Sequence, residues 1–262
     1  MTPNVVAAAA PEEVNALHER YEHVEKICAQ LWQIILDFQK HVEEMACITI
    51  NLAFETVNRI VAQHEFYKNY YELYSEGIKK FDRDREITDV CLFGEERGKS
   101  IRYGALCSRP SGLHSYGEFC IVLDGAVLQE CASLFEENPF IFLKKHPYLP
   151  KQEPCIPPGY RATWQNRGKL AVAKLGERIT ESTQPCDFPD ILTHSASDKM
   201  EDDFIEVHIS KQIIRDDIVE VRAPKKLTFG KVNPQRRAKL AKKDVLRVSK
   251  MISKLGKKWT TY

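Results

Sequence analysis

The most informative absences from this sequence of 262 residues are the short motifs that mark common enzyme classes. The chain has no G-x-G-x-x-G, no G-x-x-x-x-G-K-[ST], no G-x-S-x-G and no H-E-x-x-H. These four patterns mark, respectively, dinucleotide-binding turns, phosphate-binding loops, hydrolase nucleophiles and zinc proteases. A nucleotide would therefore have to bind without the usual glycine-rich phosphate loops.

Long apolar runs are also absent. No stretch approaches the roughly 20 apolar residues that cross a bilayer, so we expect no transmembrane segment. The apolar residues 5–10 have no basic residues before them and are too few for an export signal. We therefore expect a cytoplasmic protein.

Metal-binding patterns are missing as well. The eight cysteines and eight histidines are dispersed, with no C-x-x-C pair and no cluster at zinc spacing. Several cysteines fall inside apolar patterns, as small core residues do. We expect reduced cysteines, which fits a cytoplasmic protein, and we expect no metal site.

What the chain does have is an uneven distribution of charge. Its composition is that of a soluble globular protein, with 43% hydrophobic and 29% charged residues and a net charge of +1. Residues 222–262, however, contain 14 lysines and arginines against one acid, Asp244, which leaves the preceding 221 residues at a net −12. Such a basic tail is typical of a segment that contacts an acidic partner, an anionic membrane surface or a nucleic acid.

Two segments have strong helical periodicity. Apolar residues recur at alternating steps of three and four from Val14 to Met45, which predicts one long helix that packs on its own domain rather than in a coiled-coil dimer. The same steps recur from Ala238 to Trp259, after the helix-starting pair Asn233-Pro234, and predict a basic helix at 234–258. The apolar seam of this closing helix either docks on the body of the protein or anchors a partner.

Short strands and helices are expected between these two segments. Strands are predicted at residues 48–52, 87–93, 101–107, 116–123, 204–209 and 218–221, with 140–143 as a strand or a buried edge. Helices are predicted at 54–74, 126–135 and 164–179. The tyrosines of 66–74 either fill a core or form a wall beside a ligand. The expected class is α+β: an N-terminal helical segment (1–46) packed on the body, a body of short strands and helices (47–222), and a basic C-terminal helix (223–262).

Candidate site residues gather on two of these predicted segments. Strands 101–107 and 116–123 are each entered through a Tyr-Gly pair, and glycine allows a ligand to approach the backbone closely. Far downstream, the two-residue period of a strand puts Glu206 and His208 on one face. Alternation alone favours the interpretation of these two residues as the solvent face of a half-buried strand, with Ile205, Val207 and Ile209 inward.

Six short segments follow one another over roughly residues 48–221: Ile48-Thr-Ile-Asn-Leu52, Phe66-Tyr-Lys-Asn-Tyr-Tyr-Glu72, Arg102-Tyr-Gly-Ala-Leu106, Ser115-Tyr-Gly-Glu-Phe-Cys-Ile-Val-Leu123, Phe204-Ile-Glu-Val-His-Ile209 and Asp217-Ile-Val-Glu-Val221. Their order resembles the ADP-ribosyltransferase superfamily, and in particular a bacterial, largely uncharacterised family of toxin-like or effector-like proteins within or near it. The resemblance implies mixed or antiparallel sheets of that superfamily's type. It also implies mono-ADP-ribosyl transfer from NAD to a macromolecular acceptor, expected to be a protein, with delivery into a host cell as one setting.

The resemblance also implies roles for individual residues. Glu206 would stabilise the oxocarbenium-like charge that develops at the ribose carbon as nicotinamide leaves, as carboxylates do in glycoside cleavage. Arg102 would hold ribose or pyrophosphate oxygens with its planar fork, and Ser115 would contact the ribose. His208 would be the acceptor-side base if it faces the site. The remaining contacts to NAD are expected from Tyr103, Gly104, Ser108 and Arg161.

Phe204 stands where many members of the superfamily have a second acid or amide, which leaves the acceptor side of this assignment open. The alternative function is that of a non-enzymatic adaptor. Such a protein would use its basic C-terminal helix to bind a partner protein, an anionic membrane or a nucleic acid.

Overall fold

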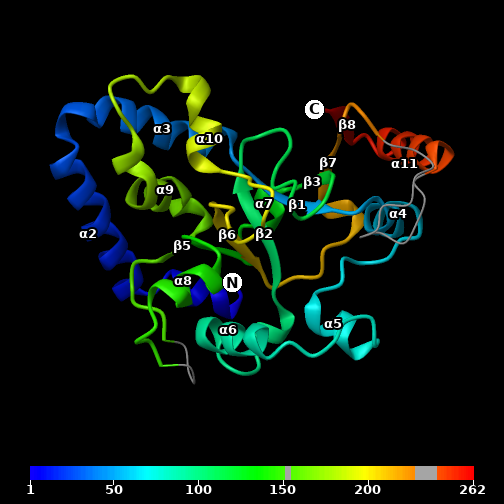
Figure 1. Cartoon of the computed structure of the whole chain (residues 1–262), viewed down its shortest axis with the longest axis horizontal. Coiled ribbons are helices and arrows are strands. Elements are labelled where there is room, and N and C mark those ends of the chain that lie inside the picture. The colour runs from blue at the N-terminus through cyan, green and yellow to red at the C-terminus, as the bar shows by residue number, and fades with distance from the viewer. Residues whose placement is uncertain (151–154, 228–240) are drawn as a thin grey trace.

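A central sheet organises the computed structural model, which describes residues 1–150, 155–227 and 241–262. Within these residues, eight strands form one sheet in the order β5-β4-β6-β2-β1-β3-β7-β8 (Figure 1). The strands are β1 Cys47–Leu52, β2 Arg102–Cys107, β3 Phe119–Leu123, β4 Ala132–Phe135, β5 Arg161–Thr163, β6 Ile205–Ile209, β7 Ile218–Ala223 and β8 Lys258–Thr261. Neighbouring strands are antiparallel except for β7 and β8, which are parallel.

Eleven α-helices accompany the sheet in the described residues. They are α1 Pro3–Ala8, α2 Pro11–Ile27, α3 Trp32–Met45, α4 Phe54–Ala62, α5 Tyr70–Ser75, α6 Arg83–Phe93, α7 Gly125–Leu128, α8 Pro139–Lys145, α9 Arg167–Leu175, α10 Phe188–Leu192 and α11 Lys242–Lys254. The expected α+β class is confirmed. No helix of the described ranges is long and apolar enough to span a bilayer.

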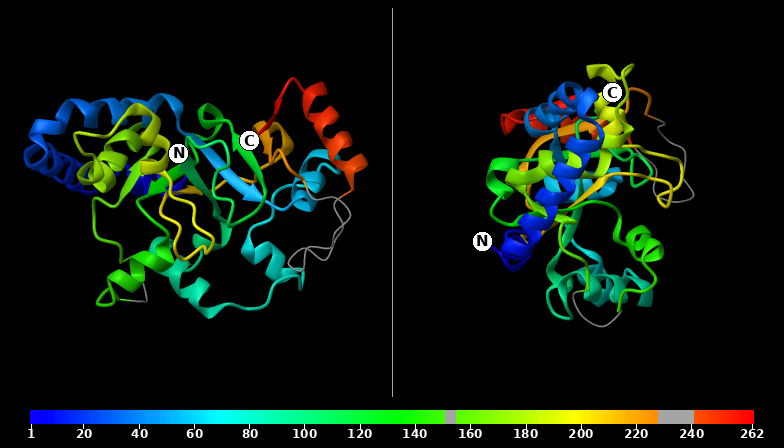
Figure 2. Two further views of the ribbon diagram at one scale, coloured as in Figure 1. Left: turned by 45° about the horizontal axis from the view of Figure 1, so that its top comes forward. Right: turned by 90° about the vertical axis from the view of Figure 1, so that its left-hand side faces the viewer.

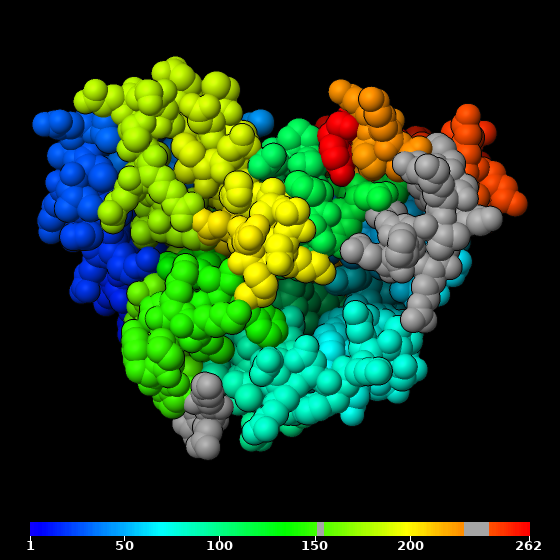
Figure 3. Space-filling view, viewed as in Figure 1, coloured from blue at the N-terminus to red at the C-terminus, as the bar shows by residue number. Residues whose placement is uncertain are grey.

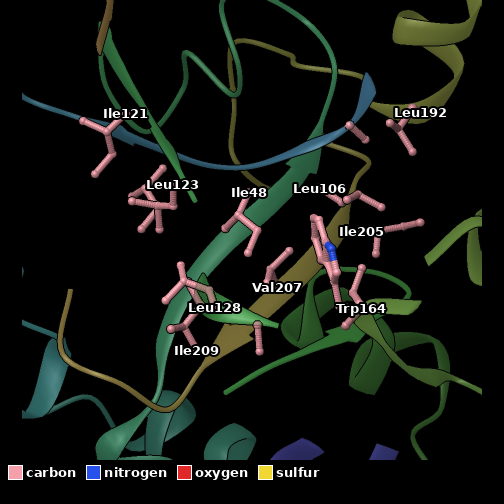
Figure 4. Packing of buried hydrophobic residues seen from close by; sticks show 14 of the residues in the cluster. Ile48, Leu106, Ile121, Leu123, Leu128, Trp164, Leu192, Ile205, Val207 and Ile209 are labelled. Atoms are coloured by element: carbon pink, nitrogen blue, oxygen red, sulfur yellow. The ribbon is translucent and has the colours of Figure 1, made fainter. Parts of the chain in front are cut away.

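One face of the sheet is apolar. Alternation along the strands turns fully buried side chains toward this face, among them Ile48, Leu106, Ile205, Val207 and Ile209. Figure 4 shows them packed against residues from other elements. Figures 1 and 2 both show α2, α3 and α9 grouped at the β5 end of the molecule and α4 with α11 at the β8 end. This face holds the main hydrophobic core.

The opposite face of the same strands is polar, yet it is also covered. The register pairs Tyr103 with His208 and Ala105 with Glu206 across β2 and β6, and it pairs Ser133 with His208 across β4 and β6. Helices α6 and α8 lie over part of this face through a second, smaller apolar cluster that includes Phe93 and Phe142. Because buried polar groups must find partners, the side chains of this face form a connected network.

The prediction of a single helix from Val14 to Met45 is wrong. A 3-10 turn at Ala29–Leu31 separates α2 from α3. Both helices contact α9, and the turn allows their apolar seams, represented by Leu17 and Phe38, to pack in one core. The period of the seam continues across the turn, which is why sequence periodicity alone did not reveal it.

Three predictions for short apolar runs are also wrong, and helix caps explain two of them. Residues 87–93 form part of α6, whose first turn is capped by the Asp82 side chain. Residues 140–143 form part of α8, which begins with Asn138 as cap and Pro139 in the first turn. The predicted helix at 126–135 is the short α7 followed by strand β4.

The aromatic segment at 54–74 is not one helix. α4 ends at Ala62, and a second helix, α5, starts at Tyr70 with a capping box formed by Asn69 and Glu72. The residues between the two helices are non-helical, and Tyr67 forms a β-bridge with Ile213. The break brings the aromatic residues over the polar face of the sheet.

The C-terminal helix docks on the protein itself. Val245, Val248 and Ile252 of α11 are buried in the main core, where α11 packs on α4 rather than on the N-terminal helices. Trp259 lies in β8 instead of the helix, because Gly256, with φ of 69°, ends α11. The predicted helix start at Asn233-Pro234 lies outside the described residues.

Candidate functional site

A cavity of about 330 Å³ opens over the polar face of the sheet. Its walls come from β1, β2 and β6, from the segment 67–79, and from α6 and the loop before β3. In Figure 3 the molecule is hollowed between the yellow segment near residue 200 and the cyan segment that contains α5. The volume is at the lower end of the range for small-molecule sites.

The two distant segments singled out in the sequence meet at this cavity. Because β2 pairs with β6, Arg102, Tyr103, Gly104 and Glu206 all line it. Strand pairing therefore joins residues that are about a hundred positions apart in the chain.

Glu206 is the acidic side chain in the wall of this cavity. The residue is 8% exposed, and its Oε1 lies 2.9 Å from Nε2 of His208. Burial raises the pKa of Glu206 to about 8, although the nearby Arg85 guanidinium acts in the opposite direction. Burial therefore favours the protonated form of this carboxyl group at neutral pH.

His208 lies beneath Glu206 and does not line the cavity. It is 1% exposed and is enclosed by the rings of Phe93, Tyr103 and Phe135. Burial, with a smaller contribution from Arg161, lowers the pKa of His208 to about 3, so the imidazole is neutral. The expectation that His208 faces a ligand as acceptor-side base is therefore corrected, as is the solvent-face interpretation of this strand.

Arg102 lines the cavity but is committed to the protein. Its guanidinium donates to Oε1 of Glu72 at 2.5 Å and to the carbonyl oxygens of Tyr67 and Ser100 at 3.1 and 2.9 Å. The side chain is 4% exposed. Arg102 therefore anchors the segment 67–72, which forms one wall of the cavity.

Three other candidates, Ser108, Ser115 and Arg161, do not line the cavity. Ser115 donates a hydrogen bond to Asp202, and Ser108 lies 2.9 Å from Nε2 of His41. Arg161 pairs with Glu13 at 2.9 Å and lines a second cavity of about 110 Å³ beneath α1 and α6. These three residues have structural partners of their own.

Tyr103 and Gly104, the two candidates that do line the cavity, also have structural roles. Tyr103 donates its hydroxyl to Oδ1 of Asp89 at 2.6 Å, and the Arg85 guanidinium lies 3.9 Å from the centre of its ring. A Cβ on Gly104 would meet the carbonyl oxygen of Thr49 at 3.0 Å. Close packing between β2 and β1 therefore explains this glycine without any ligand.

Several cavity residues were not identified from the sequence. Arg85 is the most important. It stands on α6, just before the residues 87–93 that were predicted as a strand. Its Nε bonds Oδ2 of Asp89 at 2.9 Å, one helical turn away, and the guanidinium lines the cavity beside Glu206. The i,i+4 spacing of an arginine and an acid after a capping aspartate was the available signal.

Aromatic side chains form much of the remaining wall. Tyr67, Tyr70, Tyr116 and Phe204 line the cavity, so the wall interpretation of the tyrosine cluster applies to Tyr67 and Tyr70. Tyr116 contacts Phe204 edge to face, with their ring centroids 6.3 Å apart. The cavity therefore offers several aromatic faces above a buried carboxyl group.

The mouth of the cavity is cationic. Lys68 and Lys79 line it, and the ammonium group of Lys199 lies 4.6 Å from the centre of the Tyr116 ring. Desolvation, with a smaller contribution from the charge of Lys79, lowers the pKa of Lys199. Lys68 is also paired with Glu76 at 2.7 Å. An anionic group would be attracted to this rim.

Within the described ranges, no group of three His, Cys, Asp or Glu side chains could hold a metal ion. None of the eight cysteines, all of which lie in the described residues, forms a disulfide bond. A comparison with protein-family models finds no match, and no curated protein matches the sequence.

Proposed function

We propose that the protein is an NAD-dependent mono-ADP-ribosyltransferase that modifies a macromolecular acceptor. The observation that carries this proposal is Glu206, a buried carboxyl group in the wall of a cavity that has aromatic sides and a cationic mouth. The sequence resemblance supplies the reaction class and the protein acceptor, and the geometry supplies a matching arrangement of groups.

Glu206 is suited to the chemistry at the ribose carbon. The nicotinamide ring of NAD is cationic, so its entry beside Glu206 favours the ionised carboxylate over the protonated form. The carboxylate then stabilises the positive charge that grows on the ribose as nicotinamide leaves. Because Glu206 is buried, this stabilisation is stronger than it would be in solvent.

The other groups fit the remaining parts of NAD. The rings of Tyr67, Tyr70 and Tyr116 offer stacking surfaces for nicotinamide. The diphosphate would lie at the rim, near Lys79 and Lys199. We assign the role first expected of Arg102 to Arg85, because the donors of Arg102 are committed to Glu72 and to two backbone carbonyls.

The test is release of nicotinamide from NAD and transfer of labelled ADP-ribose to proteins of a cell lysate. We expect both from the wild-type chain, and we expect the Glu206→Gln variant to be slower by about a thousandfold, as when a group that stabilises transition-state charge is removed. Glu220→Gln is the matched control, because Glu220 is a partly buried glutamate on β7 that bonds Arg222 and Thr260. It should retain full activity.

The two possible failures have different meanings. A wild-type chain that neither releases nicotinamide nor transfers label with any lysate contradicts the proposed reaction. Release that persists in Glu206→Gln contradicts the assignment of this cavity as the reaction site.

A further inference from the structure

Glu206 and His208 form a buried pair that the reaction described above uses only in part. Both side chains project from the polar face of β6, and Oε1 of Glu206 lies 2.9 Å from Nε2 of His208. Glu206 lines the cavity, whereas His208 is covered by Phe93, Tyr103 and Phe135. The His208 imidazole therefore contacts the cavity only indirectly, through its hydrogen bond with Glu206.

The charged groups around this pair are already balanced. Arg85 and Asp89 of α6 are bonded to each other, and the Tyr103 hydroxyl of β2 bonds the same Asp89. On the other side, Arg161 of β5 is paired with Glu13 of α2. Tyr116 faces Glu206 from the loop before β3, and burial keeps its hydroxyl neutral by raising its pKa. With these neighbours paired or neutral, burial favours a neutral Glu206–His208 pair, which holds one titratable proton between the two groups.

We propose that this single proton lies on Glu206 in the empty cavity and moves to Nε2 of His208 when a cationic ring enters, so that His208 is a positioning residue for the reactive carboxylate. The O–H bond of Glu206 breaks and the N–H bond of His208 forms. The net charge of the protein is unchanged, and no proton leaves for the solvent. The nature of the ring, a pyridinium, rests on the proposed function.

The geometry gives this transfer a physical advantage. A cation in the cavity favours negative charge on the nearer group, Glu206, and positive charge on the farther group, His208. The two atoms are already within hydrogen-bond distance, so the proton needs no water molecule and no side-chain movement. The resulting N–H also holds Oε1 in place and leaves Oε2 to face the ribose.

The first experiment locates the proton in the free, full-length chain at neutral pH. Infrared spectroscopy should show the carbonyl band of a protonated carboxyl group that is absent from Glu206→Gln, and ¹⁵N NMR should show a neutral His208 imidazole. An imidazolium signal from His208 in the free protein, or no difference between wild type and Glu206→Gln, overturns the proposal.

The second experiment adds 1-methylnicotinamide, which has the cationic ring but cannot donate ADP-ribose. The carboxyl band should disappear and both His208 nitrogens should become protonated. Calorimetry in buffers of different ionisation enthalpy should detect no proton release from the wild type and about one proton from His208→Asn, as follows from the proton count. No binding of the probe, a persistent band, or proton release from the wild type each overturns the proposal.

The wild-type measurements do not depend on whether His208→Asn folds. If it does fold, its kcat for nicotinamide release should fall about 100-fold, in the range typical of proton-transfer partners, with KM for NAD nearly unchanged. A merely structural residue would not move the proton signals. If the probe shifts the proton as expected but NAD is never cleaved, the proposed function fails and this inference stands.

Discussion

The two faces of the central sheet differ in what they bury, although the same strands build both. On β2 and β6, Leu106 and Val207 point into an apolar core, while Tyr103 and Glu206 of the same two strands point into a network of ions, hydroxyls and rings. Both faces are largely removed from solvent. The apolar face gains free energy by burial itself, whereas the polar face must recover the loss of hydration through specific partners.

This difference separates stability from reactivity within single strands. Changes on the apolar face should act mainly on the free energy of unfolding. On the polar face, changes should act mainly on proton positions and ligand binding, because each group there is held by named partners and its loss leaves another group unpaired. Variants chosen from opposite faces of one strand test this separation.

The largest effect on stability is expected on the apolar face. Leu106 is fully buried, so Leu106→Ala should lower the free energy of unfolding by about 2–5 kcal/mol through lost burial and a residual cavity. Urea denaturation measures this change, and nicotinamide release per folded molecule should stay within about twofold. The control is Leu246→Ala, at a leucine that is 50% exposed on α11, which should change stability by less than about 0.5 kcal/mol. A large loss of activity in folded Leu106→Ala would break the separation of the two faces.

A smaller loss is expected when the anchor of the cavity wall is removed. Arg102→Met removes the guanidinium that pairs with Glu72 and should cost about 2 kcal/mol, below the usual range for a buried pair because Glu72 is 29% exposed. Hydrogen exchange should accelerate in α5. Lys99→Met, which removes an exposed pair with Glu96, should have almost no effect. Unchanged exchange in α5 would contradict the anchoring role of Arg102.

The pH dependence of stability should show the buried pair directly. Between about pH 6.5 and 8 the folded chain retains a proton on Glu206 that the unfolded chain has lost, so stability should fall with rising pH by on the order of 1–2 kcal/mol. Between about pH 3 and 4.5 the unfolded chain binds a proton at His208 that the folded chain rejects, so stability should rise. Between pH 4.5 and 6.5 the two effects offset each other. Denaturation at a series of pH values measures this curve, and Glu206→Gln should abolish the fall above pH 6.5.

The smallest effect is expected at the cationic mouth. Lys79→Gln and Lys199→Gln should each weaken binding of ADP-ribose about threefold at low salt, with little change at high salt, because exposed charges are screened. Calorimetry measures the affinity, and Lys250→Gln on α11 is a control with the same charge change. Equal losses in all three variants would indicate a general effect of net charge rather than a rim that binds phosphate.

Much of the fold could be predicted because alternation is a local signal. The strands around Ile50, Ala105, Ile121 and Val207 follow from β-branched or alternating patterns, and the α+β class follows from them. Residues 87–93 were misassigned, since a short apolar run fits a strand and a helix equally well until the cap at Asp82 decides. The strand order could not be predicted, because pairing joins residues far apart in the chain.

The candidate site was predictable to a lesser extent. The sequence indicated that Glu206 and Tyr103 belong together, and both line one cavity. It could not indicate that Arg102 forms an ion pair with Glu72, or that Ser115 donates a hydrogen bond to Asp202, because these partners lie 30 and 87 residues away. The role of Arg85 depended on a helix that was itself misassigned.

The side chain of Asn51 has a consequence for how the cavity wall is held. Its amide donates to the carbonyl oxygens of Ser111 and Gly117, and its oxygen accepts from the backbone of Leu113. One residue of the central strand β1 thus fastens the loop that carries Tyr116 at three points. This wall of the cavity is held by the sheet itself, so the Tyr116 ring is positioned before any ligand arrives.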